Sequence, residues 1–208
     1  MLESTDGGRS TRVVGVFPVA LHLRAVAVSA DRVWVGGDTK RGRGLLLVRS
    51  GAQGVWRRVS LPAQVSEVRD VAVVASDVWI AGRAGRTGVL LRRLGGAWRE
   101  VARIRPASDR PAALVRVGIG GSGVVAVGGD GTAGVLVFSA GRGERAKTIR
   151  PRRLDSATAV TQASGEIVAM GYRAPGGIVE NATGMLLRTN RRGYRRRFNT
   201  DPLTPVES

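Results

Sequence analysis

The chain has 208 residues, of which 43% are hydrophobic and 30 are glycine, and it contains no cysteine. This composition suits a folded protein of one domain or a small pair, and the missing cysteines exclude disulfides, thiolate catalysis and cysteine-ligated zinc. The net charge of +17 comes almost wholly from arginine, which supplies 31 of the 33 basic residues. Such a charge attracts polyanions, but Ala, Gly, Val and Arg also share GC-rich codons, and codon bias is the preferred explanation.

The first segment, residues 1–18, reads MLESTDGGRSTRVVGVFP and predicts a two-stranded hairpin with a turn at Asp6-Gly7-Gly8. It has neither the basic region nor the apolar region of a signal peptide. No apolar run in the chain reaches the roughly eighteen residues that a membrane span needs. The sequence therefore predicts neither an export signal nor a membrane span, and it leaves the compartment undetermined.

Four copies of one pattern follow, each with four short apolar segments separated by glycine-rich turns. The first segments are LRAVAVS from Leu23, VRDVAVV from Val68, LVRVGIG from Leu114 and ATAVTQ from Ala157. In each copy the second segment ends in a glycine, and these four glycines are 45, 46 and 43 residues apart: Gly37, Gly82, Gly128 and Gly171. A third segment then begins with glycine, and a further glycine turn leads into the fourth.

Four short strands in each unit of about 40–50 residues are the pattern of a β-propeller blade. One small antiparallel sheet cannot bury both faces alone, so such sheets stack face to face around an axis. We therefore predict an all-β chain that forms a partial or open β-propeller. The predicted units are an N-terminal half-blade at 1–18, four four-stranded blades at 23–62, 67–105, 113–150 and 156–199, and a tail at 200–208.

The predicted ring is incomplete. Counting the hairpin at 1–18, the chain has five hairpins of third and fourth strands but only four pairs of first and second strands. Three arrangements would account for this count. The rest of a longer parent could complete the ring, a second chain could share it, or four blades could close with a spare hairpin.

The turn STDGG-RST, with Ser4, Asp6, Gly8 and Ser10, resembles the Asp-box of BNR-repeat propellers, the superfamily that includes the sialidases. Other turns keep only parts of that motif, and the resemblance implies a structural role in which side chains satisfy backbone donors. The stretch VWVGGD followed by WRRVSLP also resembles kelch repeats, as does VAVGGD at 125–130. Both resemblances imply a propeller.

Two segments resemble phosphate-binding loops. GIGGSG at 118–123 fits Gly-x-Gly-x-x-Gly, and GRGERAKT at 141–148 approaches a P-loop that would use Lys147 and Thr148. Both loops bind phosphate only where they open a helix. Strand-like sequence follows the first, and the second falls on a predicted blade hairpin, so we predict turns at both places. We expect no cofactor.

A sialidase-type glycosidase is the catalytic alternative that the Asp-box resemblance implies. It would need three arginines on a substrate carboxylate, a tyrosine nucleophile assisted by a glutamate, and an aspartate. The segment RIRP at 103–106 is weakly similar to a sialidase motif, and Tyr172, Glu166 and Glu180 are candidates, but they do not assemble a convincing set. The single histidine, His22, is predicted to lie at a partly exposed edge, and no acidic loop or histidine pair predicts a metal site.

The favoured prediction is a non-catalytic binding module with an unidentified protein or other macromolecular partner, preferably an acidic one. The loops of one blade face would carry the binding residues: Asp38, Lys40, Arg41, Arg83, Arg86, Asp130, Tyr172, Arg173 and Glu180. Nucleic acid is a less favoured partner class, for which RTNRRGYRRRFN supplies arginines beside aromatic residues. Its candidate contacts are Arg191, Arg192, Arg195, Arg196 and Arg197. An outer edge strand protected by charge is the preferred explanation of this segment.

Overall fold

A computed structural model describes residues 2–4, 9–13, 21–52, 54–120, 123–139, 146–151, 154–163, 166–173 and 183–189. Every regular element within these ranges is a β-strand. The first two strands, β1 (Leu2–Glu3) and β2 (Arg12–Val13), pair with each other as a short antiparallel hairpin. No helix in the described ranges is long and apolar enough to cross a membrane.

The remaining strands form four antiparallel sheets, in which neighbours in sequence are neighbours in space. The first sheet contains β3 (Leu21–Ser29), β4 (Arg32–Thr39), β5 (Gly44–Ser50) and β6 (Arg57–Arg58). The second contains β7 (Val65–Val74), β8 (Asp77–Ala84), β9 (Thr87–Leu94) and β10 (Ala97–Ile104).

The third sheet contains β11 (Ala113–Gly120), β12 (Gly123–Gly129), β13 (Gly134–Ser139) and β14 (Ala146–Ile149). The fourth contains β15 (Ser156–Ala163), β16 (Glu166–Arg173) and β17 (Thr183–Thr189). The fourth strand predicted for this last sheet lies outside the described residues.

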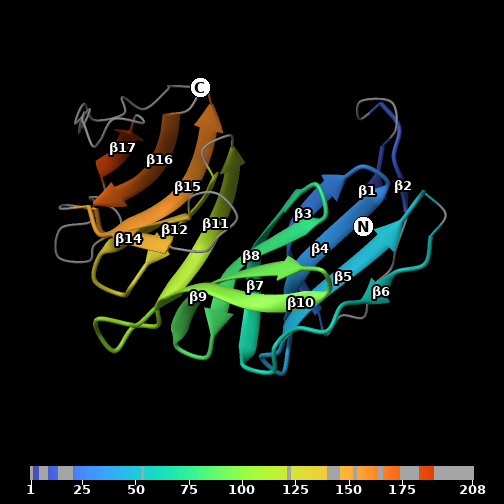
Figure 1. Ribbon diagram of the computed structural model, residues 1–208, viewed down its shortest axis with the longest axis horizontal. Helices are drawn as coiled ribbons and strands as arrows, with labels where there is room; N and C mark the ends of the chain where they lie inside the picture. Colours follow the sequence, from blue (N-terminus) through green and yellow to red (C-terminus); the bar gives the residue numbers. More distant parts are fainter. Residues whose placement is uncertain are drawn as a thin grey trace.

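The sheets stack in chain order along an arc, with β4 and β5 near one end and β15 and β16 at the other (Figure 1). The first strands lie next to one another, because β3 contacts β7, β7 contacts β11, and β11 contacts β15. Between consecutive sheets lie three apolar cores, centred on Ile80 with Val68, on Leu90 with Leu114, and on Leu136. The prediction of an all-β, open propeller is confirmed by this arrangement.

The inner edge of the first sheet is only half covered. On β3, Ala25 and Ala27 pack against the second sheet, whereas Val26 and Val28 are 64% and 70% exposed. Ring completion by a second chain or by further chain would cover these two valines, and it stays a prediction.

The recurring glycines have a common structural cause. Each first strand carries a β-bulge beside the glycine that ends the second strand, and the extra residues there are Arg24, Arg69, Val115 and Thr158; β7 has a further bulge at Ser66. Each bulge beside such a glycine pushes a carbonyl oxygen toward it. A Cβ on Gly128 would lie 1.9 Å from the Ala113 oxygen, and one on Gly82 would lie 2.1 Å from the Glu67 oxygen. Only glycine fits there, which explains why it recurs at about the length of one blade.

Candidate functional site

The candidate site lies at the end of the first two sheets where the first strands begin and the second strands end. His22 of β3 pairs in register with Asp38 of β4, and Glu67 of β7 pairs with Arg83 of β8. Arg24 and Arg69, the bulge residues beside Gly37 and Gly82, lie at the same end. We call these six residues the axial cluster: His22, Arg24, Asp38, Glu67, Arg69 and Arg83.

Asp38 is the buried carboxylate of the first sheet, with 12% of its side chain exposed. Its Oδ2 lies 2.9 Å from His22 Nδ1, and its Oδ1 accepts a 2.7 Å hydrogen bond from Arg24 Nε. Burial pushes the pKa of Asp38 upward, but the contacts with His22 and Arg24 outweigh burial and lower the pKa below its usual range. Asp38 is therefore ionised at neutral pH and holds Arg24 in place.

Glu67 is the buried carboxylate of the second sheet, with 4% of its side chain exposed. Three arginines surround it, at 3.0 Å from Arg24 Nε, 3.1 Å from Arg69 Nε and 2.8 Å from Arg83 Nε. Arg24 thus contacts a carboxylate of each sheet. Its pKa is raised, first by the hydrogen bond to Asp38 and then by the charges of Glu67 and Asp38, against the opposing effect of burial.

The axial cluster has more positive than negative charge, because three guanidinium groups face two carboxylates. The Nε–H groups of Arg69 and Arg83 are buried and close to Glu67, yet they lack the geometry of a hydrogen bond to any described acceptor. The outer parts of the side chains reach solvent, since Arg24, Arg69 and Arg83 are 41%, 34% and 30% exposed. Such a fork of fixed guanidiniums matches carboxylate and phosphate oxygens.

Asp70, three residues beyond Glu67 on β7, is a carboxyl group of a different kind. Its Oδ2 accepts a 2.8 Å hydrogen bond from the backbone N–H of Val117 on β11. Burial raises the pKa of Asp70, and this effect exceeds the opposing effects of the Val117 hydrogen bond and the Arg116 charge. Asp70 therefore retains its proton to higher pH than an ordinary aspartate does.

The same positions carry no charged pair in the other two sheets. The register partners there are Ala113 with Gly129, and Ser156 with Tyr172. Among the described residues, no group of three or more His, Asp or Glu side chains could hold a metal ion.

The structure brings Asp38 and Arg83 together from the predicted binding residues, but the others lie apart. Lys40 and Arg41 lie exposed in the turn after β4, and Arg86 in the turn after β8 donates to the Asp109 carbonyl oxygen at 2.5 Å. Tyr172 and Arg173 end β16 in the fourth sheet. Glu180 and the candidate contacts at 191, 192, 195, 196 and 197 lie outside the described residues.

Asp130 stabilises the turn in which it lies. Its side chain accepts hydrogen bonds from the backbone of Thr132 and Ala133, from the Thr132 hydroxyl and from Arg150 Nε. Burial raises the pKa of Asp130, but these bonds outweigh burial and lower the pKa overall. Asp130 lies one residue beyond the position that corresponds to Asp38, because Gly129 is the partner of Ala113 as Asp38 is of His22.

Strands lie at the ends of both segments that resemble phosphate-binding loops, and the turns predicted there lie outside the described residues. β12 begins at Gly123, the last residue of GIGGSG, and Lys147 and Thr148 lie within β14, which pairs with β13. Neither segment opens a helix, so neither has the donors that such a loop requires.

Sequence reasoning missed Arg24, Glu67 and Arg69 and gave His22 no binding role. One signal was present, because LRAV and VRDV place an arginine at the same point of two otherwise apolar strands. An arginine inside a valine-rich strand indicates a position where the side chain points away from the apolar core.

Comparison with known proteins bears on the fold. The chain is similar to the solved structure of YjhT, with a TM-score of 0.53 and 10% identity over 89% of this chain and 72% of that one. It is also similar to the Bacillus subtilis arabinanase Arb43A, with a TM-score of 0.45 and 12% identity over 81% and 72% of the two chains. An α-L-arabinofuranosidase, CtGH43, from Clostridium thermocellum ATCC 27405 gives a TM-score of 0.44 and 10% identity over 86% and 72%.

Two of these neighbours are glycosidases by name, but similarity at this level concerns the fold alone. No protein-family model matches the chain, and no curated protein matches it either.

Proposed function

We propose that the axial cluster binds a carboxylate-bearing ligand and that the protein is a recognition module built on a propeller. The observation that carries this proposal is the set of three arginines held around Glu67, whose side chains are 41%, 34% and 30% exposed. A ligand carboxylate would accept from the outer N–H groups of these arginines and balance the excess positive charge.

The arrangement suits binding because its geometry is set before a ligand arrives. Asp38 fixes Arg24, and Glu67 fixes the positions of Arg69 and Arg83, so little side-chain freedom is lost on binding. The bulges contribute as well, because they direct Arg24 and Arg69 out of the strands.

Isothermal titration with glucuronate, with glucose as the uncharged control, tests the proposal. We expect glucuronate to bind and glucose not to bind, with glucuronate affinity falling as salt is added. Arg69→Met should weaken binding about tenfold or more, because a charge-assisted hydrogen bond is lost.

Arg99→Met is the matched control for that substitution. It removes the same charge from the exposed side of β10, away from the cluster. Equal titrations of glucuronate and glucose, or equal effects of the two substitutions, would contradict the proposal.

A second candidate function is glycoside hydrolysis, and Asp70 favours it. Enzymes of this class need one carboxyl that keeps its proton and one that stays ionised. The raised pKa of Asp70 and the lowered pKa of Asp38 match these two protonation states, and the two residues lie on the second and first sheets.

Turnover of sialylated and uronic-acid aryl glycosides tests this second candidate. If the protein is an enzyme, Asp70→Asn should abolish turnover while leaving glucuronate binding intact, because the amide still accepts from Val117. Absence of turnover in the unmodified protein would remove this candidate and leave the binding proposal in place.

A further inference from the structure

A pocket lies at the opposite end of the same two sheets from the axial cluster. Its lining comes from the turn between β3 and β4 and from the turn between β7 and β8. The cavity measures about 240 Å³, smaller than the pockets that hold drug-sized ligands. We call it the intersheet pocket, and its lining residues are Ser29, Ala30, Asp31, Arg32, Trp34, Val73, Ala75 and Ser76.

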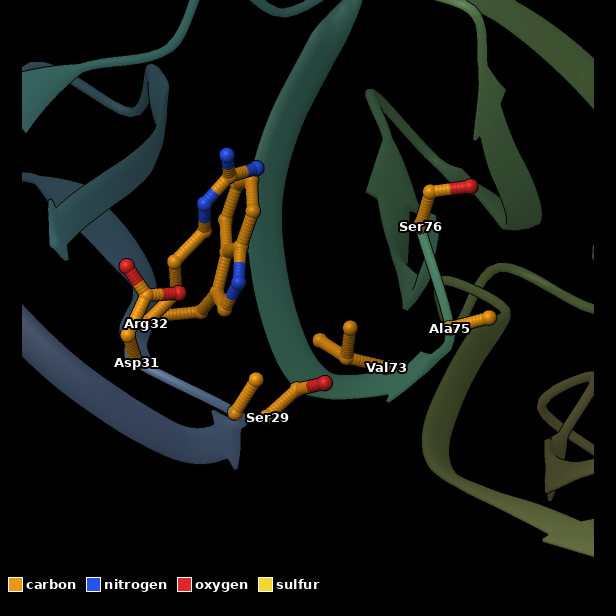
Figure 2. Close-up of a pocket in the computed structure, with 8 residues that line it drawn as sticks. Ser29, Asp31, Arg32, Val73, Ala75 and Ser76 are labelled. Carbon is orange, nitrogen blue, oxygen red and sulfur yellow. The ribbon is translucent and has the colours of Figure 1, made fainter.

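The two walls of the intersheet pocket differ in chemistry. Asp31 and Arg32 lie close together on the wall of the first sheet, and Val73 and Ala75 come from the second sheet (Figure 2). Ser29 lies between these walls. A ligand would thus meet charged groups on one side and small apolar groups on the other.

Trp34 supplies a buried donor to this lining. It is 4% exposed, and its Nε1–H has no hydrogen-bond partner among the described residues. A buried donor without an acceptor is costly, and native proteins normally satisfy it. A ligand oxygen would satisfy it here.

In the second sheet, an arginine covers the tryptophan that corresponds to Trp34. Arg92 of β9 lies over the Trp79 ring, 5.4 Å from its centroid, and its Nε donates to Asp77 at 3.0 Å. Trp34 corresponds to Trp79, because each is the third residue of the second strand of its sheet and pairs with the third strand.

The residues that would fill the first interface in the same way are absent from it. Trp34 pairs with Val48 where Trp79 pairs with Arg92, and Arg32 stands where Asp77 stands. The first interface has therefore lost the internal arginine that covers the indole, and it has gained a guanidinium on the lining of a cavity.

We infer that the intersheet pocket binds a compact amino acid or hydroxy acid. Its carboxylate would accept from Trp34 Nε1–H and pair with Arg32, as Arg pairs with carboxylates elsewhere. Its ammonium or hydroxyl group would donate to Asp31, and its short aliphatic group would lie against Val73 and Ala75. This site is separate from the axial cluster, which lies at the other end of the strands.

The test follows the indole N–H signals of the ¹⁵N-labelled protein during titration with four small probes. L-alanine and L-lactate carry both polar groups, propionate carries only the carboxylate, and isopropylamine carries only the amine. The chain has four tryptophans, so Trp34→Phe and Trp79→Phe assign the two relevant signals. We expect L-alanine or L-lactate to shift the Trp34 signal in a saturable way and to leave the Trp79 signal in place.

The affinities of L-alanine and L-lactate are then compared. Tighter binding of L-alanine indicates that an ammonium group donates to Asp31, and tighter binding of L-lactate indicates a hydroxyl group. Propionate should bind at least tenfold more weakly than the preferred acid, and isopropylamine should produce no shift. If all four probes leave the Trp34 signal unchanged, the inference is overturned.

Substitutions distinguish binding in this pocket from non-specific binding of anions to a positively charged protein. Arg32→Gln should weaken binding at least tenfold, whereas Arg57→Gln, which removes an exposed charge from the same sheet, should not. The response should persist in Arg69→Met, because that residue belongs to the other end of the sheets. Equal weakening by Arg32→Gln and Arg57→Gln would overturn the inference.

A double substitution places the ion pair that lies beside Trp79 at the corresponding position beside Trp34. Arg32→Asp with Val48→Arg recreates the Asp77–Arg92 pair over Trp34, so it should abolish ligand binding while the protein stays folded. Retained binding by this folded variant would contradict the assigned location. If the variant does not fold, the comparison of Arg32→Gln with Arg57→Gln decides the matter.

Discussion

The first two sheets and the last two share one backbone design but differ in what they present at the axial end. All four have the bulge and the facing glycine, yet only the first two place charged pairs there, His22 with Asp38 and Glu67 with Arg83. The last two place Ala113 with Gly129 and Ser156 with Tyr172. The comparison separates a structural requirement, common to every sheet, from a charged arrangement that belongs to half of them.

The largest effect is expected where the shared requirement is broken. Gly128→Ala places a Cβ 1.9 Å from the Ala113 carbonyl oxygen and should lower the free energy of unfolding by more than about 3 kcal/mol. Gly129→Ala is the matched control, because its nearest neighbour would be 3.4 Å away. Chemical denaturation measures both, and equal losses would contradict the bulge explanation.

A smaller effect is expected where the charged pairs are broken. Glu67→Gln leaves three guanidiniums without their shared carboxylate, so we expect a loss of about 2 kcal/mol in the free energy of unfolding. Denaturation in low and high salt measures it, and the loss should shrink as salt screens the arginines. Ser156→Ala alters the corresponding position of the fourth sheet, and an equal loss there would erase the distinction between sheets.

Asp70→Asn should act in the opposite direction, and modestly. Because the folded-state pKa of Asp70 is raised, its contribution to stability is fully present below the ordinary value of 3.8 and declines as pH rises through the folded pKa. The amide avoids this decline, so the variant should be more stable than the unmodified protein at pH 7 and no more stable at pH 3. Thermal unfolding at the two pH values checks the sign, and a variant less stable at pH 7 would refute it.

The smallest effect is expected at an ion pair remote from the cluster. Arg103 contacts Glu100 through Nε at 2.8 Å on the exposed side of β10, and this contact raises the pKa of Arg103. Glu100→Gln should change the free energy of unfolding by less than about 0.5 kcal/mol, because solvent screens the pair. A change as large as that of Glu67→Gln would show that burial is not what distinguishes the axial cluster.

The repeat was readable from the sequence because its cause is local. Glycine recurs at Gly37, Gly82, Gly128 and Gly171 since one backbone contact demands it in every sheet. The bulge that creates the contact left no comparable trace, because its extra residue varies from arginine to valine and threonine.

The axial cluster was only partly readable, because its contacts join separate sheets. Asp38 was selected as a loop residue, but its partner Arg24 and the contact of Arg24 with Glu67 depend on how the first sheet meets the second. The intersheet pocket depends on the same interface. The differences between Val48 and Arg92 and between Arg32 and Asp77 were visible, but their meaning required the register of each strand.

The contact between glycine and carbonyl has a consequence for how this scaffold can change. The contact that must be kept joins a carbonyl oxygen of the first strand to the glycine of the second strand. It does not restrict which side chain the nearby bulge residue carries. Each sheet thus offers one position, the bulge residue, whose side chain can change while the backbone contact stays the same. A library that varies positions 24, 69, 115 and 158 together would test how many surfaces this one fold can carry.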